Sequence, residues 1–144
     1  MKSTKFSMWF KTADKVLLRR VLEVVNSNTL EWRLIEFDGS GSPPEGLSWR
    51  QTRDLLRTRH DGIGFSWSSF KTFAHGIEDT SNCVVVAIGP KDKPDYSQIE
   101  IENFETFNVC IAARYDAFWE VFWKDHHIDR ASLANLQKEL KEIV

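Results

Sequence analysis

Residues Cys83–Ile88 form a continuous apolar run rich in β-branched side chains, and the turn signal Gly89-Pro90 follows it directly. A short run of this kind is typical of a strand that is buried on both faces. Amphipathic helical patterns come before it, and an acidic, aromatic-rich region follows it. We therefore expect the rest of the chain to pack around this strand.

Hydrophobic periodicity and turn residues divide the remaining chain into short elements. The predicted strands cover residues 5–10, 30–37, 83–88, 96–102 and 106–112, and the predicted helices cover residues 13–26, 49–60, 67–75, 115–124 and 130–143. This order predicts an α+β fold in which residues 1–144 form a single domain, with helices packed on a mixed or antiparallel sheet of about five strands.

Local signals place several helix starts and one long loop. Ser48 and Gln51 have the spacing of a capping box, and Ser66 and Asp129 stand where a helix N-cap is expected. Residues 38–46 combine Gly, Ser, Pro and acidic residues, and this composition predicts a loop.

Composition indicates a chain with a large aromatic core in a reducing compartment. There are six Trp and ten Phe, and we expect most of these rings to be buried. Cys83 and Cys110 lie in apolar patterns and are predicted to be buried free thiols. Met1–Phe10 lacks the apolar core of a secretory signal, and no apolar run is long enough to span a membrane. These features predict a cytoplasmic protein.

The polar segment Asp125–Asp129 looks most like a catalytic or metal site, because histidine and carboxylate together can bind Zn²⁺ or transfer protons. Adjacent histidines point in different directions, however, and Asp129 is already assigned as an N-cap. We expect a polar loop here. His60 and His75 are isolated at predicted helix ends, and no nucleophile or phosphate-loop motif is found. The sequence therefore predicts a non-enzymatic protein with no catalytic residue, no cofactor and no metal.

Charge is unevenly distributed along the chain. Residues 1–60 carry 11 Lys/Arg and 7 Asp/Glu, whereas residues 61–144 carry 8 and 14. The acidic excess is concentrated in residues 94–123, which hold six acids and one base. Five of these acids are the predicted partner-binding residues: Glu100, Glu102, Glu105, Asp116 and Glu120.

Two of these acids, Glu100 and Glu102, are expected on one face of a half-exposed strand, with Glu105 close by. Asp116 and Glu120, four residues apart, are expected on one helix face. A charged strand can serve only to prevent sheet-to-sheet aggregation. Alternatively, it provides a surface for a basic partner, since complementary charge accelerates association and selects the partner.

The acidic, aromatic-rich region Tyr96–Trp123, in a small α+β chain without catalytic motifs, resembles the immunity proteins of bacterial toxin systems. This group includes the partners of contact-dependent growth inhibition toxins and of nuclease bacteriocins. The resemblance implies that the chain binds the catalytic domain of a cognate toxin, a basic nuclease for example, and blocks its active site or an adjacent surface.

Two alternative functions remain open from the sequence. The first is a small enzyme or ligand-binding domain, which predicts a deep pocket with Trp and a His near a carboxylate. The second is a nucleic-acid-associated accessory protein that uses Arg50, Arg53 and Arg57, which are expected on one outer helix face. A sequence pI of about 6.1 argues against the latter, because nucleic-acid binders are usually basic overall.

Overall fold

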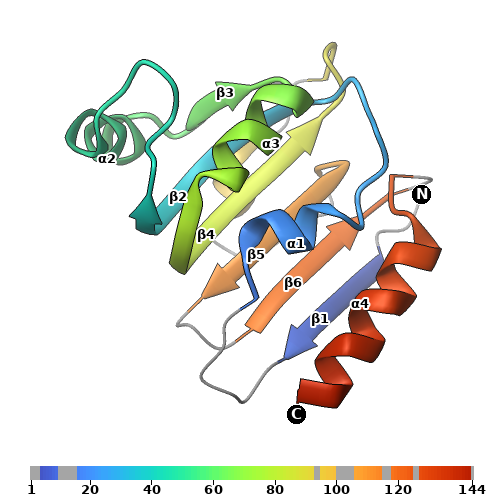
Figure 1. Cartoon of the computed structure of the whole chain (residues 1–144). Coiled ribbons are helices and arrows are strands. Elements are labelled where there is room, and N and C mark those ends of the chain that lie inside the picture. Colours follow the sequence, from blue (N-terminus) through green and yellow to red (C-terminus); the bar gives the residue numbers. More distant parts are fainter. Residues whose placement is uncertain are drawn as a thin grey trace.

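The computed structural model (Figure 1) describes residues 4–9, 16–92, 95–99, 106–114, 118–124 and 127–143. Its elements follow in the order β1 (Thr4–Trp9), α1 (Leu18–Leu22), β2 (Glu31–Gly41), α2 (Trp49–Thr58), β3 (Ile63–Phe65), α3 (Trp67–His75), β4 (Ile77–Ile88), the 3-10 helix η1 (Tyr96–Ile99), β5 (Val109–Arg114), β6 (Phe118–Trp123) and α4 (Arg130–Ile143).

The described strands form one antiparallel sheet in the order β1-β6-β5-β4-β2-β3. β4 contains the run Cys83–Ile88 and lies between β5 and β2. Every side chain of this run is at most 3% exposed, which confirms the prediction of a strand buried on both faces. The predicted α+β fold is also confirmed, with a sheet of six strands where the periodicity predicts about five.

The two faces of the sheet are buried by different parts of the chain. The larger cluster contains Cys83, Val85 and Ala87, and it includes residues of α1, α3 and α4. We call this side the helix face; α1 and α3 lie across it and α4 runs beside β1 (Figure 1). The smaller cluster contains Val84, Val86 and Ile88. We call this side the opposite face, and its described members include no residue of α1–α4.

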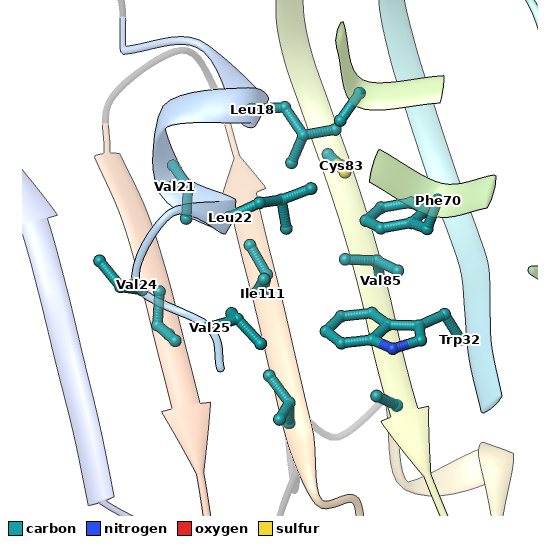
Figure 2. Close-up of a cluster of buried hydrophobic side chains, with 14 of the residues drawn as sticks. Leu18, Val21, Leu22, Val24, Val25, Trp32, Phe70, Cys83, Val85 and Ile111 are labelled. Atoms are coloured by element: carbon teal, nitrogen blue, oxygen red, sulfur yellow. The ribbon is translucent and has the colours of Figure 1, made fainter. Parts of the chain in front are cut away.

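Trp32, on β2, lies on the helix face beside Val85 and Phe70 and is fully buried (Figure 2). Its ring centroid is 4.9 Å from that of Trp67 and 5.5 Å from that of Phe70, both on α3. Its indole Nε1 donates a hydrogen bond to Asn28 Oδ1 at 2.9 Å, so the buried N–H has a partner. These contacts fix α3 over β2.

The helices α2, α3 and α4 confirm the local signals read from the sequence. Ser48 and Gln51 form the capping box of α2, and Ser66 caps α3. The Asp129 carboxylate accepts hydrogen bonds from the first turn of α4. Cys83 and Cys110 are both buried, as predicted, and neither is part of a disulfide bond.

The prediction of a helix over residues 13–26 is wrong beyond α1, and its first turn lies outside the described residues. Val25 forms an antiparallel bridge with Ile128, and the Asn26 amide donates to the His127 carbonyl at 2.8 Å. This pairing with a distant segment uses the backbone groups that a longer helix would need.

The prediction of a helix over residues 115–124 is also wrong, because residues 118–123 form strand β6 between β1 and β5. Trp119, Val121 and Trp123 belong to the helix-face cluster. Phe122 packs on the opposite face. Aromatic side chains therefore occur on both faces of one strand, and their spacing imitates that of an amphipathic helix.

The predicted strand over residues 96–102 begins instead as η1, and residues 100–105 lie outside the described part. Asp95 accounts for the turn, since its carboxylate accepts hydrogen bonds from the Ser97 amide and the Gln98 side chain. Such an aspartate turn competes with extended structure. The predicted partner strand, residues 106–112, is realised as β5, which pairs with β4 and β6.

The predicted loop over residues 38–46 is wrong in its first part, because β2 continues to Gly41. A Cβ on Gly39 would lie 2.2 Å from the Asp79 carbonyl oxygen. Gly41 has a φ of +124°, a conformation that other residues rarely adopt. Gly39 and Gly41 therefore allow β2 to approach β4 closely and accommodate the irregular register between the two strands.

Candidate functional site

The structure describes one of the five predicted partner-binding acids, Glu120. It lies in β6 opposite Ala112 of β5 and Ser7 of β1, and its side chain is half-buried. Glu120 precedes Val121 of the helix-face cluster, so strand alternation places it on the opposite face, as it does Phe122. The predicted helix face shared with Asp116 is wrong, because Glu120 is in a strand. Glu100, Glu102, Glu105 and Asp116 lie outside the described residues.

The arginines of α2 point outward, as predicted. Arg50, Arg53 and Arg57 are exposed, and Arg57 pairs with Asp54 one turn earlier at 2.8 Å. On the inner side, Trp49 stacks on Phe37 with ring centroids 5.5 Å apart and 8° between the ring planes. An exposed, partly neutralised helix face of this kind is usual for a solvated helix.

A cavity of about 460 Å³ lies between α1 with the residues after it and α3. We call it the α1–α3 cavity. Its lining residues are Arg19, Arg20, Leu22, Glu23, Val25, Ser27, Trp67, Lys71 and His75. Its volume is within the range of small-molecule sites. It also contains the Trp, the His and the carboxylate that the ligand-binding alternative predicts.

The charge of this cavity is positive. Arg20 is paired with Glu23 at 2.6 Å, which leaves Arg19 and Lys71 as two further cations of the lining. Neither of them forms an ion pair with any residue that the structure describes. The Lys71 ammonium lies 5.2 Å from the ring centroid of Trp67, a cation–π distance.

The hydrogen bonding of two further polar side chains in the lining, His75 and Trp67, is also defined. His75 Nδ1 is 2.8 Å from the Lys71 carbonyl oxygen, and because a carbonyl only accepts, this nitrogen carries the proton and Nε2 is left for another partner. The indole N–H of Trp67 is buried without a hydrogen-bond partner among the described residues. Leaving such a donor unpaired costs about 1–3 kcal/mol.

A second cavity, of about 670 Å³, lies between residues 42–47 and α3. Its hydroxyl groups serve local structure, since Ser69 completes the α3 capping box and Thr72 donates to the Ser68 carbonyl. This cavity shows no comparable set of unpaired charges in the part of the chain that is described.

A charged cluster lies at the β2–β3 end of the opposite face. The Arg33 guanidinium pairs with Glu31 and is 3.9 Å from Asp61, and a Cβ on Gly64 would lie 3.2 Å from it. Burial is the main cause that raises the pKa of the Tyr96 hydroxyl beside this cluster. These ion pairs are intramolecular, and the contact between Arg33 and Asp61 holds β2 to the turn that precedes β3.

Cys83 does not offer a nucleophile, and the described residues contain no metal-binding cluster. Cys83 is fully buried, and burial raises the pKa of its thiol far above the ordinary range, so it is not the thiolate that nucleophilic chemistry requires. Within the described ranges no group of three or more His, Cys, Asp or Glu is placed to hold a metal. Asp125 and His126 of the candidate metal segment lie outside those ranges.

The α1–α3 cavity is the feature that sequence reasoning missed. Arg19 and Arg20 lie on α1, and nothing in the sequence links them to Lys71 or His75 on α3. The packing of α1 beside α3 brings these side chains together.

No protein-family model, curated protein or solved structure matches this chain. Among the helices that the structure describes, none has both the length and the apolar character needed to cross a membrane.

Proposed function

We propose that this chain is a non-enzymatic protein-binding domain of the cytoplasm, an immunity protein that neutralises a cognate bacterial toxin by binding its basic catalytic domain. The observation that carries the proposal is a sheet face to which none of the helices α1–α4 contributes among its described residues and on which Glu120 and Phe122 lie two residues apart.

Several physical features support a protein partner at this surface. An antiparallel sheet can leave one face for contacts other than its own helices. Aromatic side chains are enriched at interface centres, and Phe122 is half-buried beside a carboxylate. The acidic excess of residues 94–123 would favour a basic partner by long-range attraction.

The binding residues in this proposal are Glu120 together with Glu100, Glu102, Glu105 and Asp116. If they contact a basic surface, charge reversal should weaken binding strongly, because each reversal replaces attraction by repulsion. We expect Glu120→Lys to weaken the partner complex by at least about tenfold, or 1.4 kcal/mol.

The experiment uses the full chain as bait in its native cell, with washes at low and then moderate salt. The proposal expects a stoichiometric basic protein that is retained at moderate salt and is toxic when expressed alone. The same capture is repeated with Glu120→Lys and with Glu100→Lys/Glu102→Lys.

Glu45→Lys is the matched control, since Glu45 is an exposed acid in the segment before α2 and undergoes the same charge change. Recovery of no toxic basic protein would contradict the proposal. Equal capture by the control and by the site variants would contradict the assigned surface.

A further inference from the structure

We propose that the α1–α3 cavity is a binding site for a small organic anion, whose carboxylate or phosphate group lies against Arg19 and Lys71. This site is separate from the proposed toxin-binding face, because α1 and α3 cover the helix face of the sheet. The inference therefore does not depend on toxin binding.

The lining of the cavity is rich in positive charge. Arg19 and Lys71 bring two positive charges to one cavity, and no described carboxylate pairs with either of them. The Glu23 carboxylate is already held by Arg20 at 2.6 Å. Two like charges that share one cavity repel each other, and an anion would relieve this repulsion.

Part of the cavity wall is apolar and rigid. Leu22 and Val25 line the cavity and belong to the buried cluster of the helix face; Figure 2 shows both side chains in that cluster. Trp67 is 8% exposed and stacks on Trp32, so its ring is fixed by the core. An apolar wall with a few polar groups is the usual composition of a ligand site.

The lining also holds a buried donor without a partner. The Trp67 indole N–H has none among the described residues. A lining with two cations and an unused N–H donor matches an oxyanion attached to a small apolar body.

The test measures binding of defined probes to the full chain by isothermal titration calorimetry at low ionic strength. Phenyl phosphate and benzoate are the anionic probes, and they distinguish a phosphate from a carboxylate ligand. Phenol and benzyl alcohol are their uncharged counterparts. We expect one-to-one binding of at least one anion, with the uncharged compound weaker by at least about tenfold.

Two variants locate the site. Arg19→Gln/Lys71→Gln should weaken binding of the anion by at least about tenfold. Ser27→Phe keeps all charges but places a ring at the cavity lining, and it should also reduce binding. Arg50→Gln/Arg53→Gln removes the same charge from the exposed face of α2 and should leave the affinity unchanged. Circular dichroism melting of each variant establishes that the fold is retained.

The proposal is overturned if neither anion binds one-to-one up to about 10 mM, or if both double variants weaken binding equally, since the attraction would then come from net charge alone. Unchanged binding in Ser27→Phe would place the anion outside the cavity. None of these outcomes bears on toxin capture, so the two proposals fail separately.

Discussion

The hydrogen bond between Trp32 and Asn28 supports both the core and the α1–α3 cavity. Asn28 Oδ1 accepts from Trp32 Nε1 at 2.9 Å and from the Leu30 amide at 3.1 Å. The Asn28 amide donates to the Asn26 carbonyl at 2.9 Å. Trp32 in turn stacks on Trp67, which lines the cavity.

The substitution Asn28→Ala leaves the fully buried indole N–H of Trp32 without a partner. An unpaired buried donor costs about 1–3 kcal/mol, so we expect the free energy of unfolding to fall by about 2 kcal/mol. For a domain of this size, this corresponds to a melting temperature lower by about 4–8 °C. Asn28→Asp keeps the acceptor for the indole and serves as the milder comparison.

A double-mutant cycle isolates the hydrogen bond from the packing. Trp32→Phe removes the indole N–H and part of the buried ring, at a cost of about 1–3 kcal/mol. In the Trp32→Phe background, Asn28→Ala no longer leaves an indole N–H without a partner. The loss of stability in the double variant should therefore differ from the sum of the two single losses by about 1 kcal/mol. Equilibrium unfolding in urea, followed by circular dichroism, measures all four proteins. Additivity to within about 0.3 kcal/mol would refute this account of the hydrogen bond.

Three further predictions concern two glycines, the Cys83 thiol and the Asp129 carboxyl. Gly46→Ala should lower the free energy of unfolding by about 1 kcal/mol, because Gly46 has a φ of +79° with open space around it. Gly62→Ala should lower it further, because the added Cβ would lie 2.0 Å from the Leu34 carbonyl oxygen. Urea unfolding measures both variants, and equal losses of stability would contradict this packing. The Cys83 thiol should resist Ellman's reagent at pH 8 until the chain is unfolded, since burial raises its pKa; fast reaction of two thiols in the native protein would contradict its burial. Hydrogen bonds from Ser132 lower the pKa of the Asp129 carboxyl in the folded chain. The carboxylate therefore stabilises the fold at pH values above its pKa in the unfolded chain, and this stabilisation is lost as the pH falls through the lower pKa of the folded chain. The melting temperature should therefore fall less steeply below about pH 4 in Asp129→Asn than in the unmodified chain, and identical pH profiles would contradict this role.

Sequence patterns predicted the elements whose signals are local. The run Cys83–Ile88 is apolar at six consecutive positions and rich in β-branched residues, a local pattern typical of a strand buried on both faces. The Ser48–Gln51 capping box and the Ser66 cap are determined within four residues of chain. Such signals do not depend on what packs against the helix.

The elements that were predicted wrongly are those determined by distant partners. The strand β6 carries aromatic residues on both faces because both sides of the sheet are packed, so its alternation is hidden. The chain after α1 leaves the helical path to pair with residues 127–129. Neither pairing can be read from the local sequence.

The two candidate sites also differ in whether they could be predicted from the local sequence. The acidic region was visible in the sequence because its members are close together in the chain. The α1–α3 cavity was not, since Arg19 and Lys71 are 52 positions apart and only tertiary packing brings them to one lining. Charge clusters within a segment are readable from sequence, whereas pockets between helices require the fold.

Titration of the captured partner is the most direct test of the proposal that this chain neutralises a basic toxin domain. The partner's catalytic activity is measured as purified chain is added in increasing molar ratio. The proposal predicts complete inhibition near one equivalent, with inhibition by Glu45→Lys unchanged and inhibition by Glu120→Lys displaced to higher ratios. Full activity of the partner in an excess of the unmodified chain would contradict the claim.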